Sequence, residues 1–324
     1  MERRDYPVSP DEDGTRLDRF IRRHHDGINQ GKIEKLLRSG SIRVDGSKAK
    51  SSTRLNQGQL VTMPAALAVG TPRPRTEHRP DPAVVSALRD AVIARGKGWI
   101  AINKPSGLAS QGGAGTVQHV DGALAEAFPG EGPPRLVHRL DRDTSGIMVV
   151  ATSLAASREL ARGFQGHGHQ KTYLALVLGV PRPQQGTIDA PLIKAGGKGQ
   201  EKMVVDYDIG QTARTDFTVL EAMGRSVSLV ALSPLTGRTH QLRAHMATLG
   251  CPILGDGKYG GSESFPHDCV TRLCLHAAHL VLEGGEAITA PCPPDLAKIM
   301  GFFGVDAAGA IRRTSQPRLF GGGA

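Results

Sequence analysis

Hydrophobic positions near the start of this chain of 324 residues follow two different spacings. Over 17–21 and again over 33–37 they recur three and four positions apart, a spacing that predicts two short amphipathic helices. Apolar residues alternate with polar ones over 42–44, the Asp-Gly pair at 45–46 predicts a tight turn, and a second apolar pair stands at 60–61. We therefore predict a small α/β unit of two helices and two strands.

Beyond residue 91 the pattern changes to short apolar runs that are typical of strands. Helical spacing occurs over 153–164, where Ser153 is a candidate N-cap, and over 239–249. The predicted strands cover 99–103, 147–152, 172–178, 217–220, 227–232 and 273–276. Many short strands with few helices between them predict an α+β fold.

Changes of composition divide the chain into five parts. These are a flexible N-terminus (1–14), the small unit (15–64), a Pro-rich linker (65–90), the main domain (91–301) and a C-terminal tail (302–324). Within the linker, Asp81 followed by Pro82 predicts the start of a short helix that ends near Arg89. The sequence contains no internal repeat.

Charge is concentrated in the small unit. The whole chain has a formal net charge of +9, and residues 15–64 alone contain eleven Lys or Arg against four Asp or Glu. Such a concentration predicts binding to a polyanion, although a well-solvated surface is the alternative. The candidate phosphate-binding residues lie mostly off the apolar helix face and are Arg16, Arg19, Lys32, Lys35, Arg38 and Arg43.

Several classes of protein are disfavoured by the sequence. No apolar run is long enough for a membrane span, and the first residues lack a secretory apolar region. Four cysteines without a CxxC pair predict neither a disulfide framework nor a zinc site, so a cytoplasmic protein is expected. The glycines at 111–115 match neither a dinucleotide nor a P-loop fingerprint, so no nucleotide or other cofactor is expected. We also expect a monomer.

The small unit resembles the S4 RNA-binding domain. The matching segments are 16–18, 33–40, 42–46 and 58–61. It departs from the family pattern at two turn positions, with Asp45 where Asn is commoner and Gln59 where Asp is commoner. The resemblance implies binding of structured RNA through shape and phosphate contacts, and it does not identify a reaction.

The segment 135–146 carries the strongest chemical signal in the main domain. It crowds charged residues into a turn that runs directly into an apolar strand, a place where catalytic groups are common. Asp141 stands between Arg139 and Arg142, and a nearby cation favours an ionised carboxylate, which can act as a nucleophile or base. An Asx-turn acceptor and a structural salt bridge are the alternative interpretations.

His-Arg-Leu-Asp at 138–141, followed by Thr-Ser-Gly at 144–146, resembles the catalytic motif of the RluA family of pseudouridine synthases. Four further segments resemble motifs of that family in the same order, namely 103–108, 171–177, 235–245 and 272–277. The resemblance implies a mixed, largely antiparallel sheet crossed by an active-site cleft. It also implies that uridine in RNA is isomerised to pseudouridine without a cofactor.

The resemblance assigns Asp141 as the catalytic aspartate, acting on either the sugar or the base. Arg243 is expected to pair with that carboxylate, and Arg238 is the alternative partner. Tyr173 is expected to stack on the uracil and could take up a proton.

The resemblance gives the remaining candidate site residues roles in RNA binding and in support of the fold. Arg139 is expected to fill the space left by the flipped nucleotide. Leu242 is expected to form an apolar wall against the base. Lys104 and His138 are expected to support the fold and to contact the RNA backbone.

The motif at 138–146 and the appended S4-like unit together favour 23S ribosomal RNA as the substrate. Two alternatives stay open, the same chemistry on tRNA and a noncatalytic RNA-binding factor in ribosome assembly. The presence of Asp141, Tyr173 and Arg243 together argues against the second, because binding alone does not need all three.

Overall fold

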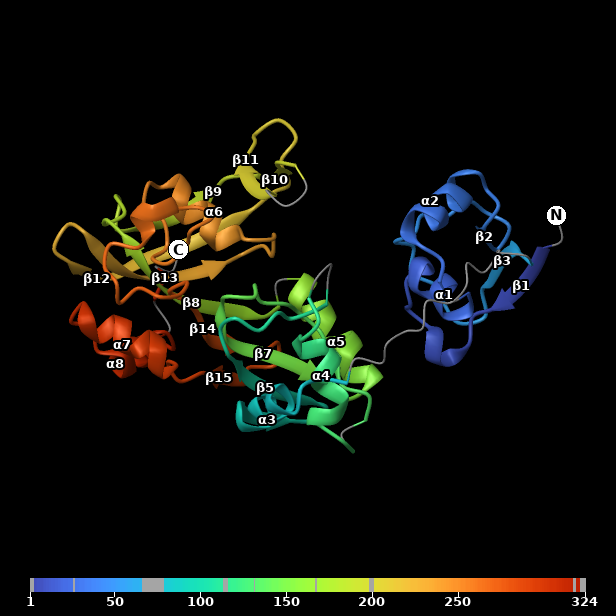
Figure 1. Cartoon of the computed structure of the whole chain (residues 1–324), viewed down its shortest axis with the longest axis horizontal. Helices are drawn as coiled ribbons and strands as arrows, with labels where there is room; N and C mark the ends of the chain where they lie inside the picture. The colour runs from blue at the N-terminus through green and yellow to red at the C-terminus, as the bar shows by residue number, and fades with distance from the viewer. Residues whose placement is uncertain are drawn as a thin grey trace. The chain divides into compact units, whose positions relative to one another are not determined.

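The computed structural model describes residues 3–25, 27–65, 79–112, 116–130, 132–166, 168–197, 201–316 and 319–320 (Figure 1). Residues 66–78 of the expected Pro-rich linker, and residues 113–115 of the glycine-rich segment, lie outside these residues. The chain forms two compact units, Met1–His78 and Arg79–Ala324, called unit 1 and unit 2 below. Within the described ranges, no helix is both long and apolar enough to cross a membrane.

Unit 1 combines two helices with a three-stranded sheet. The helices are α1 (Leu17–His24) and α2 (Gln30–Arg38), and the strands are β1 (Arg3–Pro7), β2 (Arg43–Val44) and β3 (Leu60–Pro64), in the order β1-β3-β2. The periodic residues of both helices are buried together against the sheet, as predicted, because they share one helix face. Phe20 and Ile33 are completely inaccessible to solvent.

The prediction of a flexible N-terminus over 1–14 is wrong for the described residues of that segment. Strand β1 pairs antiparallel with β3, and a short 3-10 helix follows it over Pro10–Glu12. Glu12 is buried, and its Oε1 lies 3.0 Å from Nε2 of His24. Backbone pairing and this buried contact order a segment that has no apolar pattern of its own.

The turn at Asp45–Gly46 brings together the two positions that depart from the S4 pattern. Both residues have positive φ, 47° and 75°, as a two-residue hairpin turn requires. The Asp45 carboxylate accepts the Leu60 N–H at 2.8 Å and a hydrogen bond from the Gln59 amide nitrogen, also at 2.8 Å. The Asp45 carboxylate therefore ties this turn to the start of β3.

Unit 2 is built on a ten-stranded sheet. Its order is β4-β5-β7-β14-β8-β13-β12-β9, with β6 paired to β7 and β15 paired to β14. The strands are β4 (Val92–Gly96), β5 (Trp99–Lys104), β6 (Arg135–Leu136), β7 (Ser145–Ala151), β8 (Gln170–Leu178), β9 (Gln185–Asp189), β12 (Arg214–Met223), β13 (Val227–Pro234), β14 (Leu275–Val281) and β15 (Ala287–Thr289). Among the described pairings of this sheet only β7 with β14 is parallel. The mixed α+β fold is confirmed.

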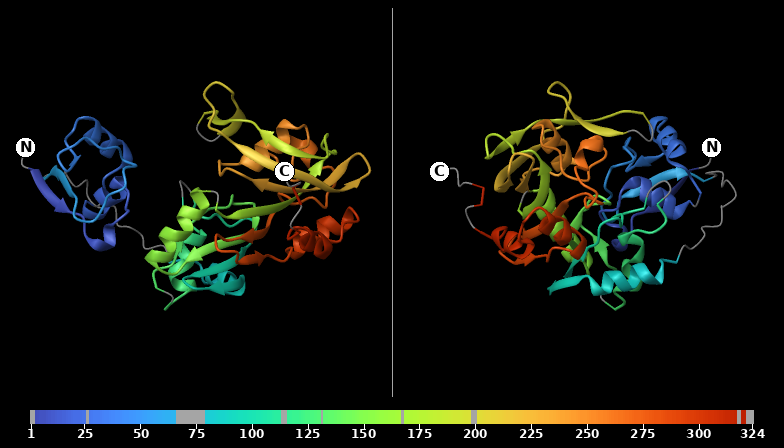
Figure 2. Two further views of the ribbon diagram at one scale, coloured as in Figure 1. Left: turned by 180° about the vertical axis from the view of Figure 1, so that it is seen from behind. Right: turned by 60° about the vertical axis from the view of Figure 1, so that its left-hand side comes forward.

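A separate hairpin of β10 (Leu192–Ala195) and β11 (Lys202–Val205) projects from the sheet (Figure 2). Near β5 and β7 the alternation of side chains gives the sheet two apolar faces. Helices α3 (Pro82–Asp90) and α4 (Val120–Ala127) pack on the face that carries Ile102 and Met148. Helix α5 (Leu154–Gln165) packs on the opposite face, which carries Trp99 and Val149.

The main domain extends further along the chain in both directions than the predicted bounds 91–301. The expected helix after Asp81 is present as α3, but it is not part of a linker, because Val85 and Leu88 are buried in unit 2. The expected tail likewise contains α8 (Ala307–Arg313), whose Ile311 is buried with α7 (Pro294–Phe302) against the sheet. The linker prediction is therefore wrong for 82–90 and the tail prediction is wrong for 307–313.

Candidate active site

Asp141 lies in the loop between β6 and β7, and the loop is anchored at its backbone. The Ser110 hydroxyl donates to the carbonyl oxygen of Leu140 at 2.5 Å and accepts the Leu140 N–H at 3.1 Å. The N–H of Gly107 donates to the carbonyl of Arg142 at 3.0 Å. The segment after β5, which the sequence singled out at 103–108, therefore contributes bonds that position the aspartate loop.

Lys104 is completely buried beneath this loop. Its Nζ donates to the carbonyl oxygens of Pro105, Leu108 and Arg142 at 2.7, 2.8 and 3.0 Å. Burial lowers the pKa of Lys104 to about 7. The expected contact with an RNA backbone is wrong for Lys104, because its charge has no solvent-accessible surface; its part is to hold the loop.

Helix α6 (Gln241–Thr248) positions Arg243. The Gln241 amide donates to the Arg214 carbonyl and to the Thr215 hydroxyl at 2.8 and 3.0 Å. His245, one turn further, hydrogen-bonds the same hydroxyl at 2.9 Å. These three hydrogen bonds to β12 fix the first turns of the helix, whose buried face carries Arg243.

Arg243 lies between two carboxylates, Asp141 and Asp256. Its Nη1 is 3.5 Å from Oδ2 of Asp141, while Nε and Nη2 donate to Asp256 at 2.7 and 2.8 Å. Asp256 is fully buried and also accepts the N–H groups of Lys258 and Tyr259, both at 3.1 Å. The two-pronged bond to Asp256 leaves one nitrogen of the guanidinium for Asp141.

His240 and Tyr259 complete the surroundings of Asp141. His240 adopts left-handed backbone angles (φ 51°, ψ 21°), and its Nε2 lies 3.9 Å from Oδ2 of Asp141. Burial lowers the pKa of His240 and outweighs the opposing charge of Asp141. The Tyr259 hydroxyl hydrogen-bonds Nδ1 of His240 at 3.1 Å, and the Tyr259 ring lies under the Arg243 guanidinium at 5.2 Å.

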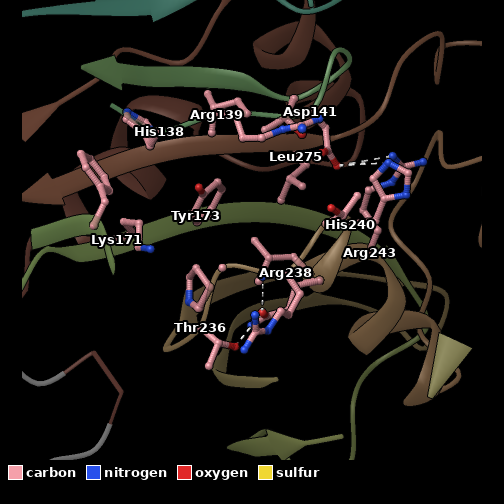
Figure 3. A pocket seen from close by; sticks show the side chains of 18 of the residues that line it. His138, Arg139, Asp141, Lys171, Tyr173, Thr236, Arg238, His240, Arg243 and Leu275 are labelled. Atoms are coloured by element: carbon pink, nitrogen blue, oxygen red, sulfur yellow. Dashed lines mark hydrogen bonds and ion pairs between the residues drawn. The ribbon is translucent and has the colours of Figure 1, made fainter. Parts of the chain in front are cut away.

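Asp141, His240 and Arg243 border a cavity of about 290 Å³, called the first cavity below (Figure 3). Tyr173 on β8 and Leu275 on β14 line it beside Asp141, and Leu242 contributes to its apolar wall. Arg139 is exposed at its edge. A volume near 300 Å³ is at the lower end of ligand cavities and suits a nucleobase.

Of the two arginines considered as partners of Asp141, Arg243 makes the contact. Arg238 also lines the first cavity, but its Nε donates to the carbonyl oxygen of Thr212 at 2.9 Å. Arg238 precedes α6, whereas Arg243 lies on the buried face of that helix. The geometry therefore favours the expected partner, Arg243, over the alternative, Arg238.

Tyr173 faces the first cavity as a neutral phenol. Burial raises its pKa, and the negative charge of Asp141 raises it further. A neutral tyrosine side chain offers the apolar face of its ring to a base and its hydroxyl as a hydrogen-bond donor. Its expected stacking on the uracil and its expected uptake of a proton stay predictions.

His138 supports the strand behind the site. Its Nε2 accepts the N–H of Val149 at 2.8 Å, and its ring stacks on Phe164 with centroids 4.1 Å apart. Burial lowers the pKa of His138 to about 3. The ring is therefore uncharged near neutral pH. Its bonds agree with the expected support of the fold, and the expected contact with the RNA backbone stays a prediction.

The acid sensitivity of the fold should report this histidine. Between the ordinary value of 6.5 and about 3, the unfolded chain binds a proton that the folded chain does not, so the free energy of unfolding falls as pH falls. Replacing His138→Gln, which keeps an acceptor for Val149, should make urea unfolding less dependent on pH between about 7.5 and about 4.5. An unchanged pH dependence, or a displaced pH–rate profile, would contradict this interpretation.

The sequence prediction missed three residues beside Asp141. Asp256 and Tyr259 lie in a glycine-rich turn after an apolar run, which was a weak signal of a functional loop. His240 lies in the segment 235–245 that resembles a family motif, but the sequence assigned it no role. Lys171 was also overlooked; it lines the first cavity two positions before Tyr173, on the same side of β8, and its pKa is lowered by burial.

Comparison with known proteins identifies the family of this chain. The model of the RNA pseudouridylate synthase family matches residues 98–248. Ribosomal large subunit pseudouridine synthase C of Rickettsia bellii (strain RML369-C) is 35% identical over 271 residues, which cover 83% of this chain and 89% of the relative. The protein of the same name from Pasteurella multocida (strain Pm70) is 35% identical over 305 residues, or 91% and 92% of the two chains.

Solved structures give the same result. Human RNA Pseudouridylate Synthase Domain Containing 4 is 27% identical with a TM-score of 0.56 and covers 68% of this chain and 95% of its own. Human RNA Pseudouridylate Synthase Domain Containing 1 is 32% identical with a TM-score of 0.52, covering 64% and 85%. The chain is an RNA pseudouridine synthase. Within that class it belongs to the RluA family, as its motifs predicted.

Proposed function

We propose that this enzyme isomerises uridines of large-subunit ribosomal RNA, with Asp141 as the catalytic group. One observation carries the proposal: Asp141, Arg243 and Tyr173, from three separate elements, meet at one cavity of nucleobase size. Curated relatives named for the ribosomal large subunit, similar along most of this chain, support the substrate.

The reaction exchanges one bond to the ribose for another. The bond from uracil N1 to C1′ breaks, the base turns over, and C5 bonds to C1′; the proton on C5 is lost and N1 gains one. Asp141 would act on the sugar or base during cleavage, while Arg243 balances its charge. The first cavity can hold the base only when the nucleotide leaves its stack, and the exposed Arg139 would fill the vacated space.

Unit 1 would provide affinity for the RNA. Arg19, Lys32, Lys35 and Arg38 are exposed on its helices, whose apolar faces are turned inward. Arg16 and Arg43 are less available, because they are partly buried and bonded within the unit. The Arg16 guanidinium binds Asp18, and Arg43 donates to backbone carbonyl oxygens.

Removal of unit 1 should separate affinity from chemistry. A chain without residues 1–78 should bind large-subunit rRNA on the order of 10²-fold more weakly, because only one of the two linked units then holds the RNA. The logarithm of affinity should also become less dependent on salt, by roughly 0.7–0.9 for each phosphate that the shorter chain no longer binds. Filter binding across a salt series measures both changes.

Turnover of a short oligonucleotide at saturating concentration should survive this truncation, because Asp141, Tyr173 and Arg243 all belong to unit 2. A folded truncated protein that is inactive on such an RNA would contradict the division of labour. So would an unchanged salt dependence.

The substrate is tested by sequencing pseudouridines in ribosomal and transfer RNA from cells with and without the protein. Sites that disappear only from large-subunit rRNA would support the proposal, whereas sites lost only from tRNA would overturn it. Cells in which no site changes would instead favour the noncatalytic alternative.

A further inference from the structure

A second cavity, of about 820 Å³, borders the first. The two share Arg139, Asp141, His240 and Arg243, so they meet at the aspartate. A uridine bound in the first cavity stays attached to its neighbours through phosphates. The RNA chain on either side of that uridine must therefore lie on the protein surface next to Asp141. The second cavity opens onto this surface, because Asp141 lines it too.

Phe265 forms an unusual part of the second cavity. It follows the short 3-10 helix Gly261–Ser264, is 43% exposed, and is one of the few large apolar side chains of the described residues at the surface. Its ring faces Gly257, because a Cβ added to that glycine would lie 3.6 Å from Cε2 of Phe265. Gly257 follows Asp256, the carboxylate that binds Arg243. The Phe265 ring therefore packs against the same turn that positions Arg243.

Exposed cations line the same cavity as this aromatic ring. The side chain of Arg142 is 72% exposed while its Nε donates to the carbonyl of Gly107, which keeps the guanidinium at the cavity. Lys258 is exposed nearby, and its Nζ donates to the Glu201 carbonyl. Asp143, 3.9 Å from Arg142, opposes part of this charge.

We propose that the second cavity binds one of the two nucleotides next to the target uridine, with its base stacked on Phe265 and its phosphate near Arg142 and Lys258. The inference rests on the proposed function, since it requires a uridine in the first cavity. An aromatic face accepts any base, so this contact adds affinity without demanding a particular sequence. Exposed cations beside it match the charge of the connecting phosphate.

The stacking contact is tested with short RNAs that differ at one position. Phe265→Ala should lower kcat/KM on an ordinary oligonucleotide by about tenfold, the usual effect of losing one stacked base. An RNA with an abasic residue immediately 5′ or 3′ of the uridine should show the same loss with the unaltered enzyme. On that abasic RNA, Phe265→Ala should cause no further loss, because both changes remove the same stacked pair.

Matched variants distinguish base stacking from a purely structural part for Phe265. Phe265→Trp should keep full activity, and Tyr207→Ala, which removes an exposed aromatic ring that lines neither cavity, should behave as the unaltered enzyme. Arg142→Gln should reduce the slope of log affinity against log salt concentration by roughly 0.7.

Two results would overturn the proposal. One is that Phe265→Ala lowers kcat/KM equally on the ordinary RNA and on both abasic RNAs, and the other is that Phe265→Ala does not lower kcat/KM at all. An unaltered enzyme that releases no tritium from any uridine-labelled RNA would instead refute the proposed function.

Discussion

Replacement of Asp141→Asn should abolish turnover and leave RNA binding nearly unchanged. Asparagine keeps the shape of the side chain but removes the charge that faces Arg243 at 3.5 Å. Loss of an essential catalytic group costs about 10⁴-fold or more in rate. Affinity should change by less than about threefold, because phosphate contacts elsewhere dominate it. Tritium release from RNA labelled at uridine C5 measures the first effect and filter binding the second.

A matched control keeps this result specific. Asp121→Asn changes an exposed carboxylate in the first turn of α4 and should be almost neutral for turnover. Release by the Asp141 variant within tenfold of the unaltered enzyme would rule out Asp141 as the catalytic group.

Replacement of Asp256→Ala should damage both stability and catalysis. Asp256 is the buried, doubly hydrogen-bonded partner of Arg243, and removing one member of a buried ion pair costs about 3–5 kcal/mol of unfolding free energy. The guanidinium would also lose the bonds that orient its Nη1 toward Asp141. A misplacement of about 1 Å can lower the rate about 10²-fold, so kcat should fall while KM changes little.

Two further variants separate orientation from stability. Asp256→Asn keeps an acceptor oxygen for Arg243 and should recover part of both losses. Asp189→Asn breaks an exposed ion pair with Arg214 and should change stability by less than about 1 kcal/mol. Urea unfolding and single-turnover kinetics on folded protein give the two readouts. An Asp256→Ala variant with normal kcat would show that Asp256 only stabilises the fold.

The parts of the structure that the sequence predicted are those in which local pattern and tertiary packing agree. Helices α1 and α2 were predictable because each buries a strictly spaced apolar face. Strand β1 and helix α8 were not. Strand β1 depends on backbone pairing with β3, and α8 consists of weakly patterned residues whose order comes from packing of Ile311.

The candidate site shows the same division. Asp141 and Tyr173 could be identified because they stand in motifs whose order along the chain is informative. Asp256 could not, because its meaning comes from Arg243, and that pair exists only when helix α6 and the following turn have folded together. Spacing also could not rank Arg238 against Arg243, since the choice depends on where α6 begins.

Strand β14 lies between β7 and β8 in the sheet, although it follows both by about a hundred residues in the chain. Its Leu275 lines the first cavity, and His276 hydrogen-bonds Ser145 at 3.0 Å just after the Asp141 loop. A chain under synthesis therefore has a gap where its central strand belongs until nearly all of unit 2 has left the ribosomal exit tunnel. Activity should therefore appear only after β14 has been made and has paired with both β7 and β8, because Leu275 and His276 complete the site from that strand.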